Sequence, residues 1–477
     1  MIFKQISCSS FLCLAFCIVT AQKTPPPAQA LPNRQQLAWH DMEYYWFIHF
    51  GPNTFTDKEW GQGDEQADIF NPTELDCRQW ARIAKQSGAK GIIITAKHHD
   101  GFCLWPSQYS THTVKESQWR NGKGDVLKEL SKACKEFGLK FGVYLSPWDR
   151  NHPQYGTAAY NDVYINTMKE LISRYGPFFE FWWDGANGEG PNGKKQQYDF
   201  RRFEQTMRRF APNTLVFSDI GPDIRWVGNE KGIAGETNWN YLDTAGFKRG
   251  EGAPPTDTLN QGNINGRYWM PAECDVSIRP GWFYHSEEDD KLKTPQELFG
   301  LYLKSVGRGA NLLLNVPPDR RGLINEKDSA ALMGFKKLRE ESFANNFITG
   351  SKAELHNKGN IFRRTKFTDN NPASFEKLTD YKNTRLWIKF DSVKKVNCIV
   401  LQEHLAEGQR VKSGKIILLN GIQEVKQLSI TTIGRKRILV FPAQEISSIS
   451  LLVTDAKGIP FISEISAYLL PEQLTAL

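Results

Sequence analysis

An aspartate stands at the end of an aromatic run in this chain, PFFEFWWDGANGEG at residues 177–190. Asp184 follows Trp182 and Trp183, at the point where a hydrophobic strand gives way to a loop rich in Gly and Asn. A parallel α/β barrel keeps its catalytic groups at such strand ends. Indole faces pack on the C–H faces of pyranose rings, so a carboxylate beside two tryptophans suits a sugar site. The plainer alternative is a strand-end aspartate that caps the next helix.

Carboxylates, hydroxyl-binding groups and aromatic side chains also follow the other predicted strands. A polyol ligand would use all three kinds of group. The residues concerned are His49, Glu59, Trp60, Lys97, His98, His99, Asp100, Tyr144, Trp148, Asp149, Asp184, Asp219, Glu230, Glu236, Glu273, Asp275, Trp282 and Asn315.

Two chemistries could use these residues. Two carboxylates can hydrolyse a glycoside, because one attacks the anomeric carbon while the other protonates the departing oxygen. Alternatively, a divalent metal held by His98, His99, Asp100 and Asp184 could activate water. Adjacent residues of an extended chain point in opposite directions, so the run HHD lacks a strong zinc spacing. The residues therefore favour the glycosidase, and we expect no metal and no cofactor.

Strand-length apolar runs alternate with helix-length amphipathic runs between residues 36 and 346. Such repeated units imply parallel strands with right-handed crossovers. Polar residues gather at nearly every strand's carboxyl end, and no Gly-rich phosphate loop follows the first strand. Both features favour a TIM-like (β/α)8 barrel over a doubly wound open sheet. Strands are predicted at 45–50, 90–96, 139–145, 178–183, 214–219 and 311–315, with less clear ones near 236–240 and 267–273. Helices are predicted at 74–88, 126–138, 161–175, 196–210, 294–307 and 325–346.

The two ends of the chain have different patterns. Residues 1–21 have a positive start, an apolar stretch and a small-residue cleavage site, which predicts a secretory signal peptide. The Pro-rich residues 22–35 predict a linker. Residues 347–477 contain short alternating runs separated by turn residues, which predict an antiparallel β-sandwich. We therefore expect an exported protein, periplasmic or extracellular, with no membrane span.

Charge and cysteine usage exclude several classes of protein. The net charge of +7 comes from basic residues without long runs, whereas a nucleic-acid groove gathers them on one face. Outside the predicted signal the cysteines are widely spaced, odd in number and without a CxxC motif. This predicts neither a disulfide framework nor a zinc knuckle.

Five linked runs resemble one known family: WFIHFGPNTFTDKEWG, TAKHHDGFCLW, GVYLSPWD, FWWDGA and RWVGNE. In order and spacing they are similar to glycoside hydrolase family 29, the retaining α-L-fucosidases. The resemblance covers the barrel, from about residue 36 to 345. It implies that Asp184 is the catalytic nucleophile, which must be ionised at rest and forms a covalent fucosyl-enzyme intermediate.

The resemblance also implies a fucose-binding site. Trp182 would help to wall it, and Trp282 in RPGWFYH would lie near the methyl face of the sugar. The residues matched to contacts with the fucose hydroxyls and ring are His49, Glu59, Trp60, His98, His99 and Tyr144. Structural alternatives remain open, since a strand-end histidine, Tyr144 or Trp282 could simply be part of the packing.

The acid/base is implied by the run RWVGNEKG, which resembles the family subgroup whose catalytic glutamate lies in this loop. That run points to Glu230, with Glu236 and Glu273 as competitors and a solvated loop glutamate as the plain alternative. The pKa of the acid/base must be raised above its usual value so that the group is protonated before the reaction begins. In a retaining enzyme the two carboxyls stand roughly 5–5.5 Å apart.

The same subgroup resemblance implies α-1,3- and α-1,4-linked fucose on branched glycans, so fucosylated oligosaccharides or glycoconjugates are the expected partners. A non-catalytic fucose-binding protein that kept the pocket is a further alternative, against which Asp184 and Glu230 argue. The C-terminal sandwich resembles a discoidin-like, carbohydrate-binding fold. It either binds glycan or packs against the barrel, and we favour packing because no aromatic cluster stands out between residues 350 and 477.

Overall fold

The computed structural model describes residues 30–357, 360–365, 368–369, 371 and 374–474. The predicted signal peptide, residues 1–21, lies outside the described residues, as does the predicted linker up to residue 29. Helix α1 begins at Arg34, because the side chain of Asn33 accepts the N–H of Gln36 and caps it. The first described helix therefore begins slightly before the predicted boundary at residue 36.

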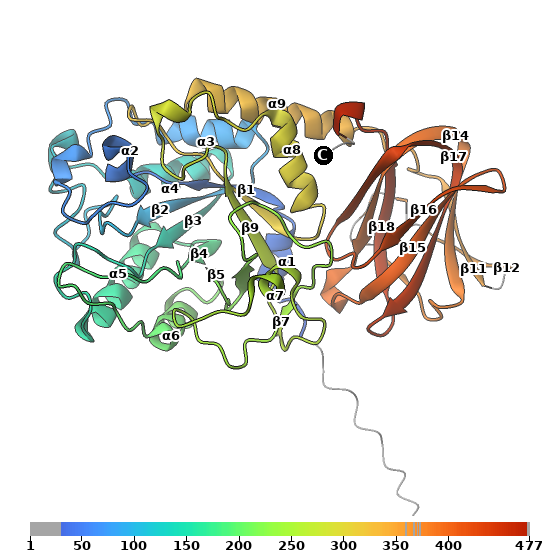
Figure 1. Ribbon diagram of the computed structural model, residues 1–477, viewed down its shortest axis with the longest axis horizontal. Coiled ribbons are helices and arrows are strands. Elements are labelled where there is room, and N and C mark those ends of the chain that lie inside the picture. Colours follow the sequence, from blue (N-terminus) through green and yellow to red (C-terminus); the bar gives the residue numbers. More distant parts are fainter. Residues whose placement is uncertain (1–29, 358–359, 366–367, 370, 372–373, 475–477) are drawn as a thin grey trace, which may run out of the picture.

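A closed barrel of parallel strands forms the first domain, which confirms the predicted fold class (Figure 1). Its strands are joined in the order β1-β10-β9-β6-β5-β4-β3-β2. Their bounds are β1 Tyr44–Ile48, β2 Gly91–Lys97, β3 Lys140–Leu145, β4 Glu180–Trp182, β5 Leu215–Ser218, β6 Ile224–Trp226, β9 Ala272–Ser277 and β10 Asn311–Asn315. The intervening short strands β7 Tyr241–Leu242 and β8 Tyr268–Trp269 pair with each other outside the barrel.

Helices cover the outside of the barrel, and side-chain caps fix where several of them begin. Asp76 caps α3 and Asp125 caps α4, because short acidic side chains accept the free N–H groups of a first turn. The helices are α1 Arg34–His40, α2 Pro52–Thr56, α3 Cys77–Gln86, α4 Val126–Phe137, α5 Ala159–Tyr175, α6 Phe200–Phe210, α7 Thr256–Gln261, α8 Pro295–Lys304 and α9 Glu326–Ser342.

The barrel interior is filled by side chains from alternate strand positions, as its pleat requires. One buried cluster contains Phe47, Tyr144, Trp182, Phe217 and Leu313, contributed by five different strands. This layer forms a solid floor on which the groups at the carboxyl ends of the strands rest.

The sixth barrel strand differs from the prediction. It is β6, Ile224–Trp226, and not a strand near 236–240. Only residues 219–223 connect it to β5, without a helix, so the alternation used to find the other strands has no counterpart here. Arg225 on β6 is fully buried and donates to the carbonyl of Leu259. The seventh strand, predicted at 267–273, is β9 at Ala272–Ser277.

The C-terminal domain is antiparallel throughout and encloses its own apolar core. The long strands β14 Thr384–Glu403 and β17 Arg437–Ala456 pair along both halves, with a register shift between Lys389 and Lys394. One half continues through β11 and β15, the other through β18. The remaining bounds are β11 Lys352–Asn357, β12 Asn360–Thr365, β13 Glu376–Lys377, β15 Val411–Asn420, β16 Gln423–Ile430 and β18 Phe461–Tyr468.

The two domains lie side by side (Figure 1) and are joined by specific polar contacts. The buried side chain of Gln409 donates to the carbonyl of Asn238 at 2.8 Å and accepts the N–H of Asn240 at 2.8 Å. Lys436 forms an ion pair with Glu43 at 2.6 Å. The sandwich thus packs on the loop that follows β6 and on the start of β1.

Candidate active site

Asp184 lies just beyond the carboxyl end of β4, with its side chain 23% exposed. Tyr144 on β3 donates its hydroxyl to Asp184 Oδ2 at 2.8 Å, and the N–H of Ala186 donates to Oδ1 at 2.7 Å. The next helix, α6, is capped by Asp199. The capping alternative for Asp184 is therefore wrong, and its carboxylate is held in place while remaining open to solvent.

The two tryptophans before Asp184 point to opposite sides of β4, as alternation along a strand requires. Trp182 faces the barrel interior, where its ring stacks on Phe217 with centroids 4.0 Å apart. Trp183 is fully buried outside the barrel and packs against Phe200 of α6. The expectation that both indoles serve a sugar site is thus wrong for Trp183.

His49 stands directly after β1 and is fixed by Asn315 at the end of β10. The His49 Nδ1–H donates to Asn315 Oδ1 at 2.8 Å, which leaves Nε2 as an acceptor. Burial lowers the pKa of His49 to about 3, so the ring is neutral under ordinary conditions. The Trp282 ring lies 5.1 Å from the His49 ring, and its carbonyl accepts from Asn315.

His98 and His99 lie in the loop after β2, with ring centroids 4.1 Å apart and ring planes inclined by 40°. His99 Nε2 lies 3.8 Å from Asp184 Oδ2, and His99 Nδ1 lies 2.8 Å from the hydroxyl of Ser146. Burial lowers the pKa of His99 to about 4 and that of His98 well below its usual value. Both are therefore neutral hydrogen-bonding groups at the site.

The turn after these histidines depends on a glycine. Asp100 Oδ1 accepts the N–H of Phe102 at 2.7 Å, and between them Gly101 adopts φ +86°. A Cβ at Gly101 would also collide with the carboxylate of Asp149. Asp149 in turn forms a buried ion pair with Lys97 at 3.0 Å.

Glu59 is held by the loop that carries Trp282. Its Oε2 accepts the N–H of Trp282 at 2.8 Å, and its Oε1 accepts the N–H of Phe283 at 3.2 Å. His285 Nε2 lies 2.7 Å from the same Oε1. Trp60, the next residue, is 55% exposed, and its ring lies 5.7 Å from that of His99. The loops after β1 and β9 thereby close one side of the site.

Glu230 lies at the rim, in the loop after β6. Partial desolvation of its carboxyl raises the pKa of Glu230, and the charges of Asp184 and Glu59 raise it further. A hydrogen bond from the side chain of Trp282 acts in the opposite direction. Glu230 therefore holds its proton more strongly than an isolated glutamate would, and it lies within electrostatic reach of Asp184.

The two competitors of Glu230 lie elsewhere. Glu236 is 73% exposed at the boundary with the sandwich, where it approaches Arg308 at 3.7 Å. Glu273 is fully buried inside the barrel, and its Oε1 accepts the indole N–H of Trp182 at 2.8 Å. Glu236 thus lies at the domain boundary, and Glu273 lies in the layer beneath the site.

Asp219, at the end of β5, is a further acid beside Asp184. Burial, and next the charge of Asp184, raise the pKa of Asp219 to about 6. Within the described part of the chain, no three His, Cys, Asp or Glu side chains gather as metal ligands.

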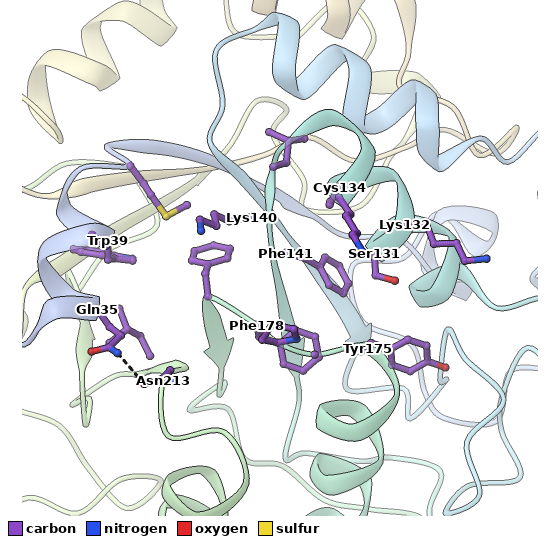
Figure 2. A pocket seen from close by; sticks show the side chains of 18 of the residues that line it. Gln35, Trp39, Ser131, Lys132, Cys134, Lys140, Phe141, Tyr175, Phe178 and Asn213 are labelled. Carbon is purple, nitrogen blue, oxygen red and sulfur yellow. Dashed lines mark hydrogen bonds between the residues drawn. The ribbon is translucent and has the colours of Figure 1, made fainter.

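A cavity of about 810 Å³ opens at the opposite end of the barrel (Figure 2). Gln35 and Asn213 are hydrogen-bonded across its wall. It lies at the amino-terminal ends of β3 and β5 and contains none of the predicted site residues. Its lining includes Trp39, Lys132, Lys140, Phe141, Tyr175 and Phe178.

The family model described as Alpha-L-fucosidase matches residues 27–337. The chain belongs to the alpha-L-fucosidase family. Alpha-L-fucosidase 1 of Arabidopsis thaliana is 41% identical over 454 residues, which are 93% of this chain and 88% of the plant protein.

Solved structures agree with this membership. A glycoside hydrolase 29 family member from an unknown rumen bacterium superposes with a TM-score of 0.83 at 40% identity, covering 94% of this chain and 78% of that one. A Ruminococcus gnavus family 29 fucosidase in complex with fucose has a TM-score of 0.83 at 29% identity, covering 95% and 98% of the two chains. This member of the alpha-L-fucosidase family is therefore a glycoside hydrolase.

Some contacts of this family member's site did not emerge from the sequence. His285 orients Glu59, and Ser146 orients His99. The only sequence signal for His285 is its place in the run RPGWFYH, three residues after Trp282. None of the described helices has the length and apolarity that a bilayer crossing requires.

Proposed function

We propose that the enzyme hydrolyses terminal α-L-fucose with retention of configuration, using Asp184 as nucleophile and Glu230 as acid/base. Asp184 Oδ attacks the anomeric carbon while Glu230 donates its proton to the departing glycosidic oxygen, so that the C1–O bond breaks and the leaving sugar departs as an alcohol. A water molecule then attacks the same carbon, gives its proton to Glu230 and releases Asp184.

One observation supports this proposal: two acids with different surroundings lie at the carboxyl end of the barrel, within electrostatic reach of each other. Asp184 accepts hydrogen bonds from Tyr144 and Ala186, which stabilise a carboxylate. The pKa of Glu230 is shifted upward by partial desolvation and by the charge of Asp184, which is the direction that a proton donor needs. A nucleophile and a proton donor need this division of roles.

The other site residues have supporting roles in the proposal. Neutral His49, His98 and His99 offer hydrogen bonds to sugar hydroxyls, as does the Glu59 carboxylate, while Trp60 and Trp282 offer aromatic surface. Tyr144 orients the nucleophile, and Trp182 lies in the layer beneath it.

Kinetics with two substrates would test the catalytic pair. Asp184→Ala should abolish turnover of both a fucosylated trisaccharide and a nitrophenyl α-L-fucoside. Glu230→Ala should lose activity on the trisaccharide but retain much more on the nitrophenyl fucoside, whose leaving group needs little protonation. Azide should rescue Glu230→Ala and yield β-fucosyl azide. Glu236→Ala serves as the matched control, and azide rescue of that variant instead would overturn the assignment.

Retention is tested by NMR of the first-formed sugar. A retaining enzyme releases α-L-fucose before mutarotation, whereas initial release of the β-anomer would contradict the two-step mechanism.

We also propose a preference for α-1,3- and α-1,4-linked fucose on branched glycans and export to the periplasm or outside of the cell. The first rests on the resemblance of RWVGNE to one subgroup, the second on residues 1–21. A panel of α-1,2-, α-1,3-, α-1,4- and α-1,6-fucosylated oligosaccharides with product analysis tests the preference. Mass spectrometry of the amino terminus of the mature protein tests export, and an uncleaved Met1 in a cytoplasmic fraction would refute it.

A further inference from the structure

Strand β9 presents two carboxyl groups to the interior of the barrel, Glu273 and Asp275. They lie two residues apart and so face the same side of the strand. Both are buried, Glu273 at 0% and Asp275 at 4% exposure. A barrel interior is usually filled by branched apolar side chains, and buried carboxyls are costly unless their oxygens are hydrogen-bonded. Neither carboxyl has a role in the two-step mechanism above.

Each of these carboxyls accepts the indole N–H of a tryptophan on another strand. Glu273 Oε1 accepts from Trp182 on β4 at 2.8 Å. Asp275 Oδ1 accepts from Trp226 on β6 at 2.9 Å. An indole has a single N–H donor, so each bond fixes the rotation of a large flat ring within the barrel.

The first pair leads to the nucleophile. The Trp182 ring lies between Phe217, with centroids 4.0 Å apart, and Tyr144, with centroids 5.4 Å apart and planes inclined by 29°. Tyr144 then donates to Asp184 Oδ2. Rotation of the indole would withdraw the surface on which the Tyr144 ring rests, and would move the hydroxyl that orients the Asp184 carboxylate.

The second pair leads to the acid/base. Trp226 is the last residue of β6, and the loop that carries Glu230 begins directly after it. Asp275 and Glu230 lie close enough to interact electrostatically, since the charge of Glu230 contributes, after burial, to the raised pKa of Asp275. Fixing Trp226 therefore fixes the point from which the Glu230 loop departs.

The buried carboxyls of β4 and β9 accept their hydrogen bonds without an ion pair to a lysine or arginine among the described residues. Glu180 on β4 accepts from Trp39 Nε1 at 3.0 Å and shares the hydroxyl of Tyr45 with Glu273. Among the described residues, neither Glu180 nor Glu273 nor Asp275 forms an ion pair. Burial raises the pKa of all three, so protonation relieves the cost of burying them while their remaining oxygens accept the indole N–H groups.

We propose that β9 supplies one positioning residue for each catalytic carboxyl: Glu273, through Trp182 and Tyr144, for Asp184, and Asp275, through Trp226, for Glu230. This inference rests on the proposed function, because it uses the roles assigned there to Asp184 and Glu230.

The test compares isosteric and apolar replacements in the full chain. Glu273→Gln and Asp275→Asn keep an oxygen that can accept the indole N–H, whereas Glu273→Leu and Asp275→Leu remove it. We expect Glu273→Leu to lower kcat at least tenfold on both the fucosylated trisaccharide and the nitrophenyl fucoside, because the nucleophile acts on both. Glu273→Gln should recover most of that loss. A Trp182→Phe variant should lose nothing further when Glu273→Leu is added.

Asp275→Leu should behave differently. Its kcat should fall at least tenfold on the trisaccharide and less than threefold on the nitrophenyl fucoside, and the alkaline limb of the pH profile on the trisaccharide should move. Asp275→Asn should restore the limb. If the role of Asp275 were purely structural, Asp275→Leu would lower activity on both substrates alike, because less protein would be folded. Circular dichroism and thermal unfolding of each variant would detect that loss.

Two outcomes would overturn the inference. Equal losses on both substrates for Asp275→Leu would remove its link to Glu230, and full activity of folded Glu273→Leu would remove its link to Asp184. Failure of the proposed function has a separate signature, since Glu230→Ala would then show no leaving-group dependence. Should the apolar variants not fold, Trp182→Phe and Trp226→Phe decide, because each removes the indole N–H that its carboxyl accepts. Full activity of both variants on both substrates would refute the proposal.

Discussion

At the scale of single residues, the chemistry of the site depends on the protonation states of the histidines and carboxyls around Asp184. Asp184 accepts hydrogen bonds from the Tyr144 hydroxyl and the Ala186 N–H, and His49 and His99 near it are neutral. Burial removes the charge from the histidines, because it disfavours the charged form of a base. The surroundings of Asp184 thus stabilise its charge through directed hydrogen bonds, which leaves the carboxylate available for attack.

Tyr144→Phe should weaken catalysis without unfolding the enzyme. A hydrogen bond to a charged group contributes about 1.5–3 kcal/mol, so kcat/KM should fall about 10- to 100-fold. The matched control is Tyr175→Phe, which removes a hydroxyl bonded to Asp125 at 2.8 Å, the distance of the Tyr144 bond. Steady-state kinetics on the fucosylated trisaccharide provide the measurement, and equal rates for the two variants would contradict the role of Tyr144.

Asp219→Asn should change how stability depends on pH. The folded-state pKa of about 6 lies above the unfolded value of 3.8, so the folded state holds the proton more strongly. Stability is then lost as the pH rises from about 4 through 6. The variant should gain about 3 kcal/mol relative to the unmodified enzyme at pH 7.5 and only about 0.5 kcal/mol at pH 4. Urea unfolding at both values measures this, with the exposed Asp243→Asn as control; an equal gain at pH 4 would exclude titration as the cause.

At the scale of elements, loops after β1, β6 and β9 bring together residues far apart in the sequence. The loop from β9 to α8 carries Trp282 and the backbone N–H groups that hold Glu59. It is anchored by Arg279, which donates to both oxygens of Asp328 on α9, at 2.9 and 2.8 Å. Both side chains are fully buried.

Asp328→Ala should release this loop. Removing one partner of a buried ion pair typically costs about 3 kcal/mol, although Asp289 remains beside Arg279 at 2.9 Å. Thermal unfolding should shift downward, and the KM for the trisaccharide should rise because Trp282 and Glu59 lose their support. Asp290→Ala, which breaks an exposed pair with Lys327, should leave both quantities unchanged. Loss of stability with an unaltered KM would show that the loop does not depend on this anchor.

The sequence predicts elements well where a strand and a helix alternate. β10 coincides with the predicted 311–315, and the strands from β1 to β5 lie within a few residues of their predictions. β6 was missed because its three residues gain strand geometry only by pairing with β5 and β9, which is a tertiary effect. The side assigned to Trp183 was wrong because two adjacent tryptophans give no indication of which one faces the interior.

The residues of the candidate site could be predicted from the sequence, but the buried contacts that hold them in place could not. The sequence could place Asp184, His49 and Glu230 at strand ends or in the following loops. It could not show that Glu273 lies beneath the site, because a buried acid and a catalytic acid look alike in a sequence. Whether Glu230 or Glu236 approaches Asp184 depends on the path of the loop after β6, which the contacts of the second domain help to set.

At the scale of the whole molecule, the sandwich braces the catalytic domain. The loop after β6 passes Glu230 and then reaches Asn238 and Asn240, which Gln409 of the sandwich binds. Ion pairs of Arg435 with Asp41 at 2.8 Å and of Lys436 with Glu43 add to the contact. These bonds favour packing over glycan binding as the main role of the sandwich.

Gln409→Ala should uncouple the two domains. The change leaves the carbonyl of Asn238 and the N–H of Asn240 buried without the partners they have in Gln409, and each such loss costs about 1–3 kcal/mol. Differential scanning calorimetry should then resolve two unfolding transitions where the unmodified protein unfolds in one. Gln444→Ala, at a half-buried position of β17 where the side chain donates to the Pro442 carbonyl, is the matched control. Because Gln409 binds the loop that carries Glu230, activity on the trisaccharide should fall more than activity on the nitrophenyl fucoside. A single, unshifted unfolding transition with unchanged activity would mean that the sandwich is held to the barrel by other contacts.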